Sequence, residues 1–223
     1  TNLEFLIATL DFLDKDEATS VAQFLSTTAR EMSRRGLFDQ IGGGFHRYCV
    51  DGNWTIPHFE KMLYDQAQIA VNFLEAYQAT GDERFAWVAR GVFDYVGRDL
   101  THREGGCYSA EDADSLLDHE GTDHAEGAFY VWTKGEIEAA VGADAVFFCE
   151  HYGIKEEGNV PAKLDPQGEF VLKNILHQQQ SLGVTAETHG LEPQAAADKL
   201  ASCLEKLRAA RAHRPRPHLD DKI

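Results

Sequence analysis

DQIGGGFHRY, residues 39–48, lies between two stretches of helical periodicity. Its three consecutive glycines permit backbone paths and close approaches that side chains forbid. Titratable residues are crowded around the glycines, which is more typical of the rim of a functional site than of a simple connector. These residues are Asp39, His46, Arg47, Asp51, His58, Glu60 and Asp65.

Helical periodicity dominates the chain on both sides of this loop. Apolar residues recur at the spacing of one helix face, and Pro57 suits the first turn of a helix, where a missing N–H does no harm. The pattern predicts helices over residues 2–13, 17–35, 58–79 and 83–100.

The second half of the chain mixes helices with short extended segments. Thr133 and Glu136 have the spacing of a capping box, which predicts the start of a short helix. Pro193 begins a last, longer helix. Two segments that contain aromatic residues, 107–109 and 128–132, favour strands, and we expect them to form a hairpin. The chain is therefore predicted to be all-α with a small β-hairpin insertion.

The sequence contains a faint internal repeat, in which the same succession of elements occurs twice. Helix, short acidic turn, helix, glycine, aromatic residue and acidic cluster follow one another, first around residues 16–17 and then around residues 82–83. This order suggests stacked helical hairpins, each ending in a functional loop on the same side. We therefore expect the glycine loop of residues 39–48 to lie beside the acidic loop of residues 109–115.

Composition narrows the class of partner. The chain has 223 residues and a formal net charge of -16, so its surface should repel phosphate backbones and anionic membranes. No stretch is long and apolar enough to span a bilayer. We expect neither a nucleic acid nor a membrane as partner. Both ends of the chain look like cuts through a longer protein.

The four cysteines indicate the redox compartment. Cys49, Cys107, Cys149 and Cys203 are widely spaced and form no Cys-x-x-Cys motif. This spacing fits reduced thiols in a cytoplasmic or organelle-matrix protein better than a disulfide framework. A zinc site is not expected, because neither histidine spacing nor thiol partners support one, and we predict no cofactor.

Two groups of residues could carry chemistry, one around the glycine loop and one around the acidic loop. Carboxylates, histidines and an arginine beside aromatic rings suit a polyol ring, whose apolar faces stack while its hydroxyls bond to charged groups. Paired carboxylates serve glycoside hydrolysis, and paired histidines can move a proton beside a carbonyl. The catalytic candidates are Glu60, Asp112, His58, His46 and Asp114, and the substrate-binding candidates are Arg47, Tyr48, Trp54, Glu111 and Trp132.

Structural roles compete with each of these assignments. His46 and His58 suit buried hydrogen-bonding positions, and Glu60 suits the positive end of a helix. The acidic residues of the second loop could cap a helix, ligate calcium or face water. Arg47 could brace Asp39 or Asp112 rather than contact a substrate.

Five sequence motifs are long and specific: DQIGGGFHRY (39–48), W-x-x-PHFEKMLYDQAQ (54–68), YSAEDADS (108–115), EGAFYVWT (126–133) and RPRPHL (214–219). By these motifs the chain resembles a known family, the spermatogenesis-associated thioredoxin-like proteins and their bacterial and fungal relatives. The resemblance extends over nearly the whole chain and departs from the usual pattern at Cys49 and Cys107.

This resemblance implies an architecture that the chain would fill only in part. Family members resemble a thioredoxin-like domain followed by a six-hairpin (α/α)6 toroid, which is similar to N-acylglucosamine 2-epimerases and several glycosidases. Residues 1–223 would then be the N-terminal portion of the toroid. The thioredoxin-like domain is expected upstream in the same polypeptide, and the remaining hairpins are expected downstream.

Residues and resemblance together lead to two expectations. The first is a carbohydrate-active site of the epimerase, isomerase or glycosidase kind, with a small carbohydrate as ligand. The second is a non-catalytic scaffold whose ring binds a sugar or partner and positions the thioredoxin-like domain. A redox enzyme would need cysteines in another part of the protein, because none here are arranged for exchange.

Overall fold

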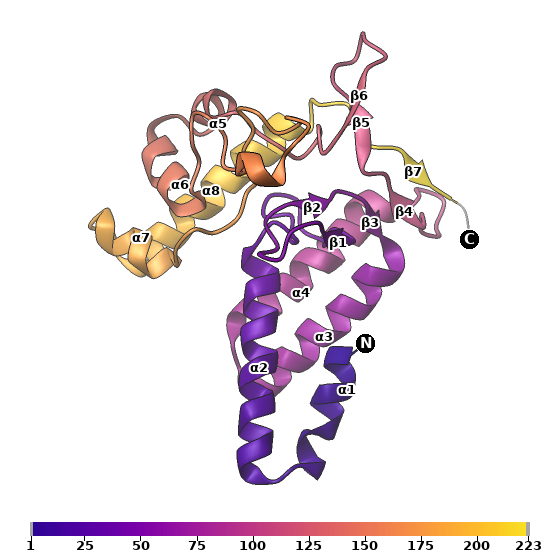
Figure 1. Ribbon diagram of the computed structural model, residues 1–223, viewed down its shortest axis with the longest axis vertical. Coiled ribbons are helices and arrows are strands. Elements are labelled where there is room, and N and C mark those ends of the chain that lie inside the picture. The colour runs from indigo at the N-terminus through magenta and orange to yellow at the C-terminus, as the bar shows by residue number, and fades with distance from the viewer. Residues whose placement is uncertain (1, 222–223) are drawn as a thin grey trace.

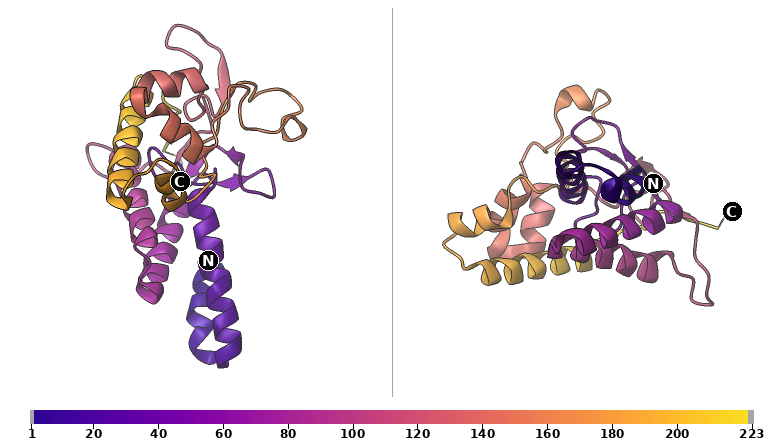
Figure 2. Two further views of the ribbon diagram at one scale, coloured as in Figure 1. Left: turned by 90° about the vertical axis from the view of Figure 1, so that its left-hand side faces the viewer. Right: turned by 90° about the horizontal axis from the view of Figure 1, so that it is seen from below.

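The computed structural model describes residues 2–221, and its helices form two groups (Figure 1). The second group lies above one end of the first, next to the glycine loop and the small sheets (Figure 2). The first group contains α1 (Asn2–Thr9), α2 (Lys15–Arg34), α3 (Leu63–Thr80) and α4 (Glu83–Tyr95). The second contains α5 (Lys134–Val141), α6 (Ala145–Tyr152), α7 (Leu182–Thr188) and α8 (Pro193–Arg211).

Helix signals in the sequence account for most of these boundaries. Asp14 caps α2 in a capping box with Glu17, and Thr133 caps α5 in the predicted box with Glu136. Pro193 stands in the first turn of α8, where its missing N–H is harmless. The predicted helices at both ends of the chain and around residue 133 are therefore confirmed.

Each helix group has its own apolar core. In the first group, aromatic side chains of the glycine loop pack against the inner faces of α3 and α4. In the second, α5, α6 and α8 enclose Trp132, the last residue of the aromatic segment before α5. The fully buried members are Phe38, Phe45, Phe73, Phe85, Val88 and Val92 in the first core, and Trp132, Ile137, Phe148, Tyr152, Cys203 and Leu207 in the second.

The strands form three small antiparallel sheets. One joins β1 (Tyr48–Cys49) to β2 (Pro57–His58), and another joins β5 (Asp114–Leu116) to β6 (His124–Glu126) in a hairpin that projects away from the helices (Figure 1). The third has the order β3-β4-β7 and consists of Lys61–Met62, Ala110–Glu111 and Leu219–Asp220. Its register sets Lys61 opposite Glu111, so the glycine-loop region and the acidic loop are neighbours in space.

The sequence-based prediction was wrong about the start of the third helix. α3 begins at Leu63 rather than near residue 58, and Pro57 lies in β2 instead of a first helical turn. Pro57 can occupy β2 because this strand belongs to a two-stranded sheet, in which a residue without N–H is tolerated at the edge. Pro57 and His58 pair with the nearby β1, whereas Lys61 and Met62 pair with a distant segment, and no local helix signal reveals such pairing.

The predicted hairpin was also placed wrongly. Residues 107–109 and 128–132 do not pair with each other; the hairpin consists of β5 and β6, which lie between them. Trp132 instead forms an isolated bridge with Asn174. Aromatic residues at 128–132 are buried because they enter cores, and this burial resembles a strand pattern in the sequence.

The last predicted helix of the first group changes form before it ends. α4 continues into a π-helical segment, η2 (Val96–Leu100), which brings Arg98 and Asp99 towards the glycine loop. The Arg98 side chain donates a hydrogen bond to the carbonyl of Gly42 at 2.7 Å. Single π-turns inside helices often occur at functional sites.

The chain is thus mostly helical with a small β component, as expected. No helix within residues 2–221 is long and apolar enough to cross a membrane.

Candidate functional site

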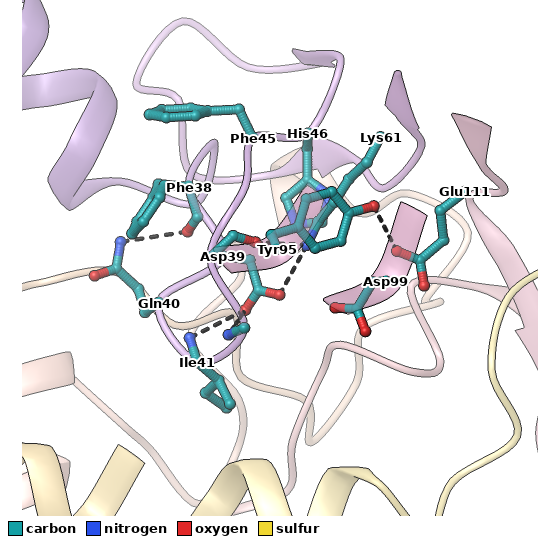
Figure 3. Close-up of polar contacts among 12 residues, drawn as sticks. Phe38, Asp39, Gln40, Ile41, Phe45, His46, Lys61, Tyr95, Asp99 and Glu111 are labelled. Atoms are coloured by element: carbon teal, nitrogen blue, oxygen red, sulfur yellow. Dashed lines mark hydrogen bonds and ion pairs between the residues drawn. The ribbon is translucent and has the colours of Figure 1, made fainter. Parts of the chain in front are cut away.

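A buried charge network connects the glycine loop to the second helix group. Asp39 at the start of the loop accepts a hydrogen bond from the Lys61 ammonium at 2.8 Å (Figure 3). The Arg211 guanidinium near the end of α8 binds both Asp39 oxygens, each at 2.9 Å. Lys61 also donates to the Gly43 carbonyl at 3.0 Å. One carboxylate therefore ties together three segments far apart in the chain.

Burial and charge act against each other at this network. Burial raises the pKa of Asp39, but the nearby positive charges of Arg211 and Lys61 outweigh it and hold that pKa well below its ordinary value. For Lys61, burial prevails over the attraction of Asp39 and lowers the pKa of the ammonium. The pKa of Arg211 stays raised despite its burial, because Asp39 favours its charged form.

Glu111 forms the centre of a second part of the network. Its carboxylate accepts hydrogen bonds from the Tyr95 hydroxyl at 2.7 Å (Figure 3) and from Arg216 at 3.1 Å. Arg216 reaches Asp99 of the π-segment at 2.8 Å with its other terminal nitrogen. The Lys61 ammonium lies 4.2 Å from the centre of the Tyr95 ring. The two parts of the network are therefore contiguous.

A second, more exposed group lies around Glu60, and we call it the Glu60 cluster: Arg47, Tyr48, His58, Glu60, Tyr64, Asp65 and Glu126. Arg47 pairs with Glu60 at 2.8 Å. The His58 ring stacks on Tyr48 with 5.0 Å between ring centres. Its Nε2 lies 3.8 Å from Glu60, and its Nδ1 lies 2.7 Å from Glu126.

The contact between His58 and Glu126 orients the imidazole. Glu126 comes from β6, and the same oxygen also accepts the backbone N–H of Phe59 at 3.2 Å. A carboxylate oxygen accepts hydrogen bonds, so Nδ1 of His58 donates to Glu126. The other ring nitrogen, Nε2, thus lies beside Glu60, and this grouping of an oriented imidazole with a carboxylate suits proton transfer.

Asp65 adds a carboxyl group with altered acidity to the Glu60 cluster. Burial raises its pKa, Arg47 opposes the rise, and Glu60 adds to it. Oδ2 of Asp65 is buried without a hydrogen-bond partner among the described residues. The cluster thus contains a carboxyl group whose pKa is raised, next to another that is paired with an arginine.

The structure separates the predicted site residues into exposed and buried sets. His46 is buried between Phe59 and Tyr130, and its Nδ1 donates to the Phe59 carbonyl at 2.9 Å. Burial and the charge of Lys61 lower the pKa of His46 to about 3, so the ring is neutral. Buried with it are Glu111 and Trp132, whereas Arg47, Tyr48, Asp112 and Asp114 are exposed, and His58, Glu60 and Trp54 are partly buried.

The two predicted substrate-binding tryptophans, Trp132 and Trp54, contact other parts of the fold. The Arg214 guanidinium lies 3.8 Å from the centre of the Trp132 ring, which belongs to the second core. Trp54 has a positive φ of 57°, and its carbonyl accepts the N–H of Gly36 at 2.9 Å. Neither ring belongs to the Glu60 cluster.

The two predicted acid–base carboxylates, Glu60 and Asp112, lie next to the same pair of strands. Lys61 of β3 is paired with Glu111 of β4. Glu60 directly precedes Lys61 and Asp112 directly follows Glu111, so both lie at the same end of this antiparallel strand pair. Because side chains alternate along a strand, they are expected on the face opposite to Lys61 and Glu111. The partly exposed state of Glu60 and the exposed state of Asp112 agree with this placement.

Sequence reasoning gave no role to the cations and the tyrosine of the buried network. Lys61 lies within the PHFEKM run, and Arg211 and Arg216 lie in and after α8. The contacts of Arg211 with Asp39 and of Arg216 with Glu111 depend on chain packing across more than 100 residues. The sequence feature that could have pointed to one of these cations was the unusual RPRPHL run, which contains Arg216.

Cysteines and potential metal ligands are dispersed over the described residues. Within residues 2–221 no three His, Cys, Asp or Glu side chains are grouped so that they could hold a metal ion. The four cysteines are unpaired. Burial and the nearby charge of Asp51 raise the pKa of Cys49 to about 12, so its thiol stays protonated.

The fold and the site define a mostly helical protein with small antiparallel sheets and a charged centre beneath its glycine loop. No protein-family model matches the chain. The chain is similar to human spermatogenesis-associated protein 20, with 45% identity over 217 residues that cover 93% of this chain and 28% of that protein. The mouse protein of the same name is 46% identical, covered to 27% of its length. An uncharacterized protein of Caenorhabditis elegans is 34% identical to the chain, and the alignment covers 96% of this chain and 32% of the length of that protein.

The relatives are thus much longer than the aligned region. The chain spans less than a third of the length of each of these curated relatives.

Proposed function

We propose that this chain is the N-terminal portion of an (α/α)6 toroid and that the Glu60 cluster is its carbohydrate-active site. The observation that carries the proposal is the Glu126–His58–Glu60 arrangement, with contacts of 2.7 and 3.8 Å on the two sides of one imidazole ring. The helical hairpins α1–α2 and α3–α4 support the toroid, since each is followed by a polar loop and the two loops meet. A thioredoxin-like domain in the same polypeptide and a cytoplasmic or matrix location belong to the same proposal.

The favoured reaction is proton transfer on a sugar, as in an epimerase or isomerase. Nε2 of His58 takes the proton from the carbon beside the sugar carbonyl, and the electron pair moves onto the carbonyl oxygen. Arg47 stabilises the developing negative charge. The Asp65 carboxyl, whose pKa is raised by burial, donates a proton to the carbonyl oxygen, and its carboxylate takes a hydroxyl proton back when a carbonyl re-forms. Delivery of the His58 proton to the neighbouring carbon gives an isomer, and delivery of a proton to the original carbon from its opposite face by a second acid gives an epimer.

The remaining members of the cluster would bind the sugar ring. Tyr48 and Tyr64 are half exposed, at 50% and 48%, on the surface that carries Glu60. Exposed aromatic faces suit the apolar side of a pyranose, and the carboxylates accept hydrogen bonds from its hydroxyls. A glycosidase of the same site would use Glu60 with Asp112 or Asp65 as its carboxyl pair.

Deuterium exchange tests the proposal directly. The complete protein is incubated in deuterated water with a panel of aldoses, ketoses and N-acetylhexosamines, and NMR follows loss of the proton beside the carbonyl and release of free sugar. We expect exchange with one class of sugar. Glu126→Gln should reduce it roughly 10²–10⁴-fold, since the imidazole loses its orienting carboxylate. Glu120→Gln, an exposed change in the same β5–β6 hairpin, is the control and should leave the rate unchanged.

A second candidate, a non-catalytic scaffold that binds sugars or partners, is supported by the buried network. Asp39, Lys61 and Glu111 are almost fully buried and mutually satisfied, which is typical of residues that hold segments together. In a scaffold, Glu60→Gln and Asp112→Asn would leave sugar or partner binding intact, whereas an enzyme would lose turnover and keep its fold. Absence of exchange and hydrolysis across the panel, with binding retained, would favour the scaffold.

A further inference from the structure

A cavity of about 520 Å³ lies on the side of the buried network that faces α8. Its walls come from the π-segment η2, from the last turns of α8 and from the segment that follows α8, with Phe129 as an apolar wall. Cavities of this size hold small-molecule ligands in many proteins. The cavity is distinct from the Glu60 cluster, since none of the residues that line it belongs to that cluster.

Arginines dominate the charged lining of this cavity. Arg98, Arg208, Arg211 and Arg216 line it together with two acidic residues, Asp99 and Glu205. The whole chain has the opposite balance, with 37 acidic and 21 basic residues. Four guanidinium groups at one concavity of so acidic a protein are therefore a local concentration of positive charge.

Buried partners behind the wall do not neutralise this charge. Asp39 and Glu111 lie behind Arg211 and Arg216, and the Lys61 ammonium, which pairs with Asp39, adds a further positive charge. Lining and partners together contain five cationic side chains and four carboxylates. They are Arg98, Arg208, Arg211, Arg216 and Lys61 against Asp39, Asp99, Glu111 and Glu205. These groups leave one positive charge in excess at the cavity, and a concave surface with such an excess attracts an anion.

The arginines also retain unused hydrogen-bond donors. Each guanidinium has five N–H groups, and Arg98 donates through Nη2 to Gly42 and Asp99. Arg208 is exposed at the cavity, and its side chain forms no hydrogen bond or ion pair with any residue in the range 2–221. Planar donor forks of this kind match the paired oxygens of a carboxylate or phosphate group.

We infer that this cavity, which we call the arginine cavity, binds a small organic oxyanion, with the charged group held by Arg98 and Arg208 and the carbon skeleton packed on Phe129. Asp39 and Asp99 hold Arg211 and Arg216 in place, so the inner part of the cavity is formed before the ligand arrives. The shared chemistry is a carboxylate or phosphate oxyanion. This inference is independent of the proposed sugar reaction.

Three matched probes test the inference on the complete protein by isothermal titration calorimetry at low ionic strength. Glycerol 3-phosphate carries a phosphate, glycerate carries a carboxylate, and glycerol carries neither. We expect one or both anions to bind and glycerol to give no signal. Preference between the two anions identifies the charged group of the natural ligand, and absence of binding by both overturns the inference.

Arg208→Gln is the diagnostic variant, because the side chain is exposed and its loss leaves no buried group unpaired. We expect it to weaken anion binding about tenfold or more, as befits loss of a charged hydrogen-bond donor. Arg90→Gln, which removes an exposed arginine of α4 outside the cavity, is the charge-matched control and should leave the affinity unchanged. An equal loss in both variants, or none in Arg208→Gln, would show that the anion binds elsewhere.

Discussion

Asp39 is the residue on which the buried charges depend. Its carboxylate accepts hydrogen bonds from Lys61 and Arg211, and its Oδ1 also accepts the backbone N–H groups of Ile41 and Gly42, both at 3.0 Å. The same side chain thus shapes the glycine loop and pairs with two buried cations. A buried ion pair stabilises little relative to an apolar replacement, but removal of one partner leaves the other charges uncompensated.

Asp39→Asn should therefore destabilise the fold strongly. The amide keeps the size of the side chain but removes the negative charge between Lys61 and Arg211. We expect the free energy of unfolding to fall by roughly 3–5 kcal/mol, measured by urea denaturation. Asp94→Asn, an exposed carboxylate of α4, is the control and should change it by less than about 0.5 kcal/mol. A small effect at both positions would mean that the network is solvated.

The contact between the glycine loop and α4 determines how these two elements fit together. Gly43 and Gly44 have φ values of 75° and 77°, a region that favours glycine. A Cβ on Gly43 would lie 2.3 Å from the Gly91 carbonyl oxygen, and one on Gly44 would lie 2.5 Å from the Tyr95 ring. The loop backbone lies directly on the helix, and the Gly43 carbonyl at this contact accepts a hydrogen bond from Lys61 at 3.0 Å.

Gly43→Ala should separate the loop from α4. The added methyl group meets backbone rather than a mobile side chain, and the residue would also be strained at its positive φ. We expect a loss of stability of about 2 kcal/mol or more. Gly52→Ala is the matched control, since nothing lies within 4 Å of its Cβ position and it has no positive φ. Thermal unfolding of both variants measures the difference, and equal melting temperatures would contradict the loop placement.

Contacts between the two helix groups hold the molecule together. Arg211 of α8 reaches Asp39 of the glycine loop, and Gln178 donates to the Gln40 side chain at 3.3 Å and through its backbone to the Arg34 carbonyl at 2.7 Å. Each part of the molecule also contains a buried neutral histidine. His46 lies under the glycine loop, and His151 of α6 contacts Thr185 of α7 at 3.0 Å.

These histidines make the stability of the molecule depend on pH. Burial and Lys61 lower the pKa of His46 to about 3, and burial and Arg84 lower that of His151 to about 4, from an ordinary value of 6.5. At a pH below 6.5 but above these lowered pKa values, the histidines of the unfolded chain bind protons that the same histidines in the folded chain do not. Stability is therefore complete above pH 6.5 and falls as the pH decreases towards 4, with each histidine contributing up to about 1.4 kcal/mol per pH unit.

Urea denaturation at pH 7, 6 and 5 measures this dependence. His46→Asn should reduce the slope of stability against pH by the share of one histidine. His218→Asn, an exposed histidine, should leave the slope unchanged. A stability that stays flat between pH 7 and 5 would contradict the buried neutral state of both rings.

Helices were the part of the fold that the sequence could predict. Capping residues such as Thr133, and apolar periodicity along α2, α4 and α8, act within a few residues of one another, so the signal is local. Strands of two or three residues were not predictable in this way. Pro57 and Lys61 are extended because partners at Cys49 and Glu111 pair with them, and short segments carry almost no periodicity of their own.

The candidate site was predictable in part, for the same reason. The crowding of Arg47, His58 and Glu60 lies within one short stretch, and the structure joins these three side chains directly. Glu126, which orients His58, comes from 68 residues further along the chain.

The amino-acid sequence by itself determined the helices, their caps and the glycine loop, because those depend on neighbours along the chain and on the steric freedom of glycine. Tertiary structure alone decided which charges are buried and which groups they meet. Lys61 and Glu60 are adjacent in sequence, yet the fold buries the first against Asp39 and leaves the second partly exposed beside His58. Burial changes the free energy of a charge far more than residue type does, and burial is set by segments that meet only when the chain has folded.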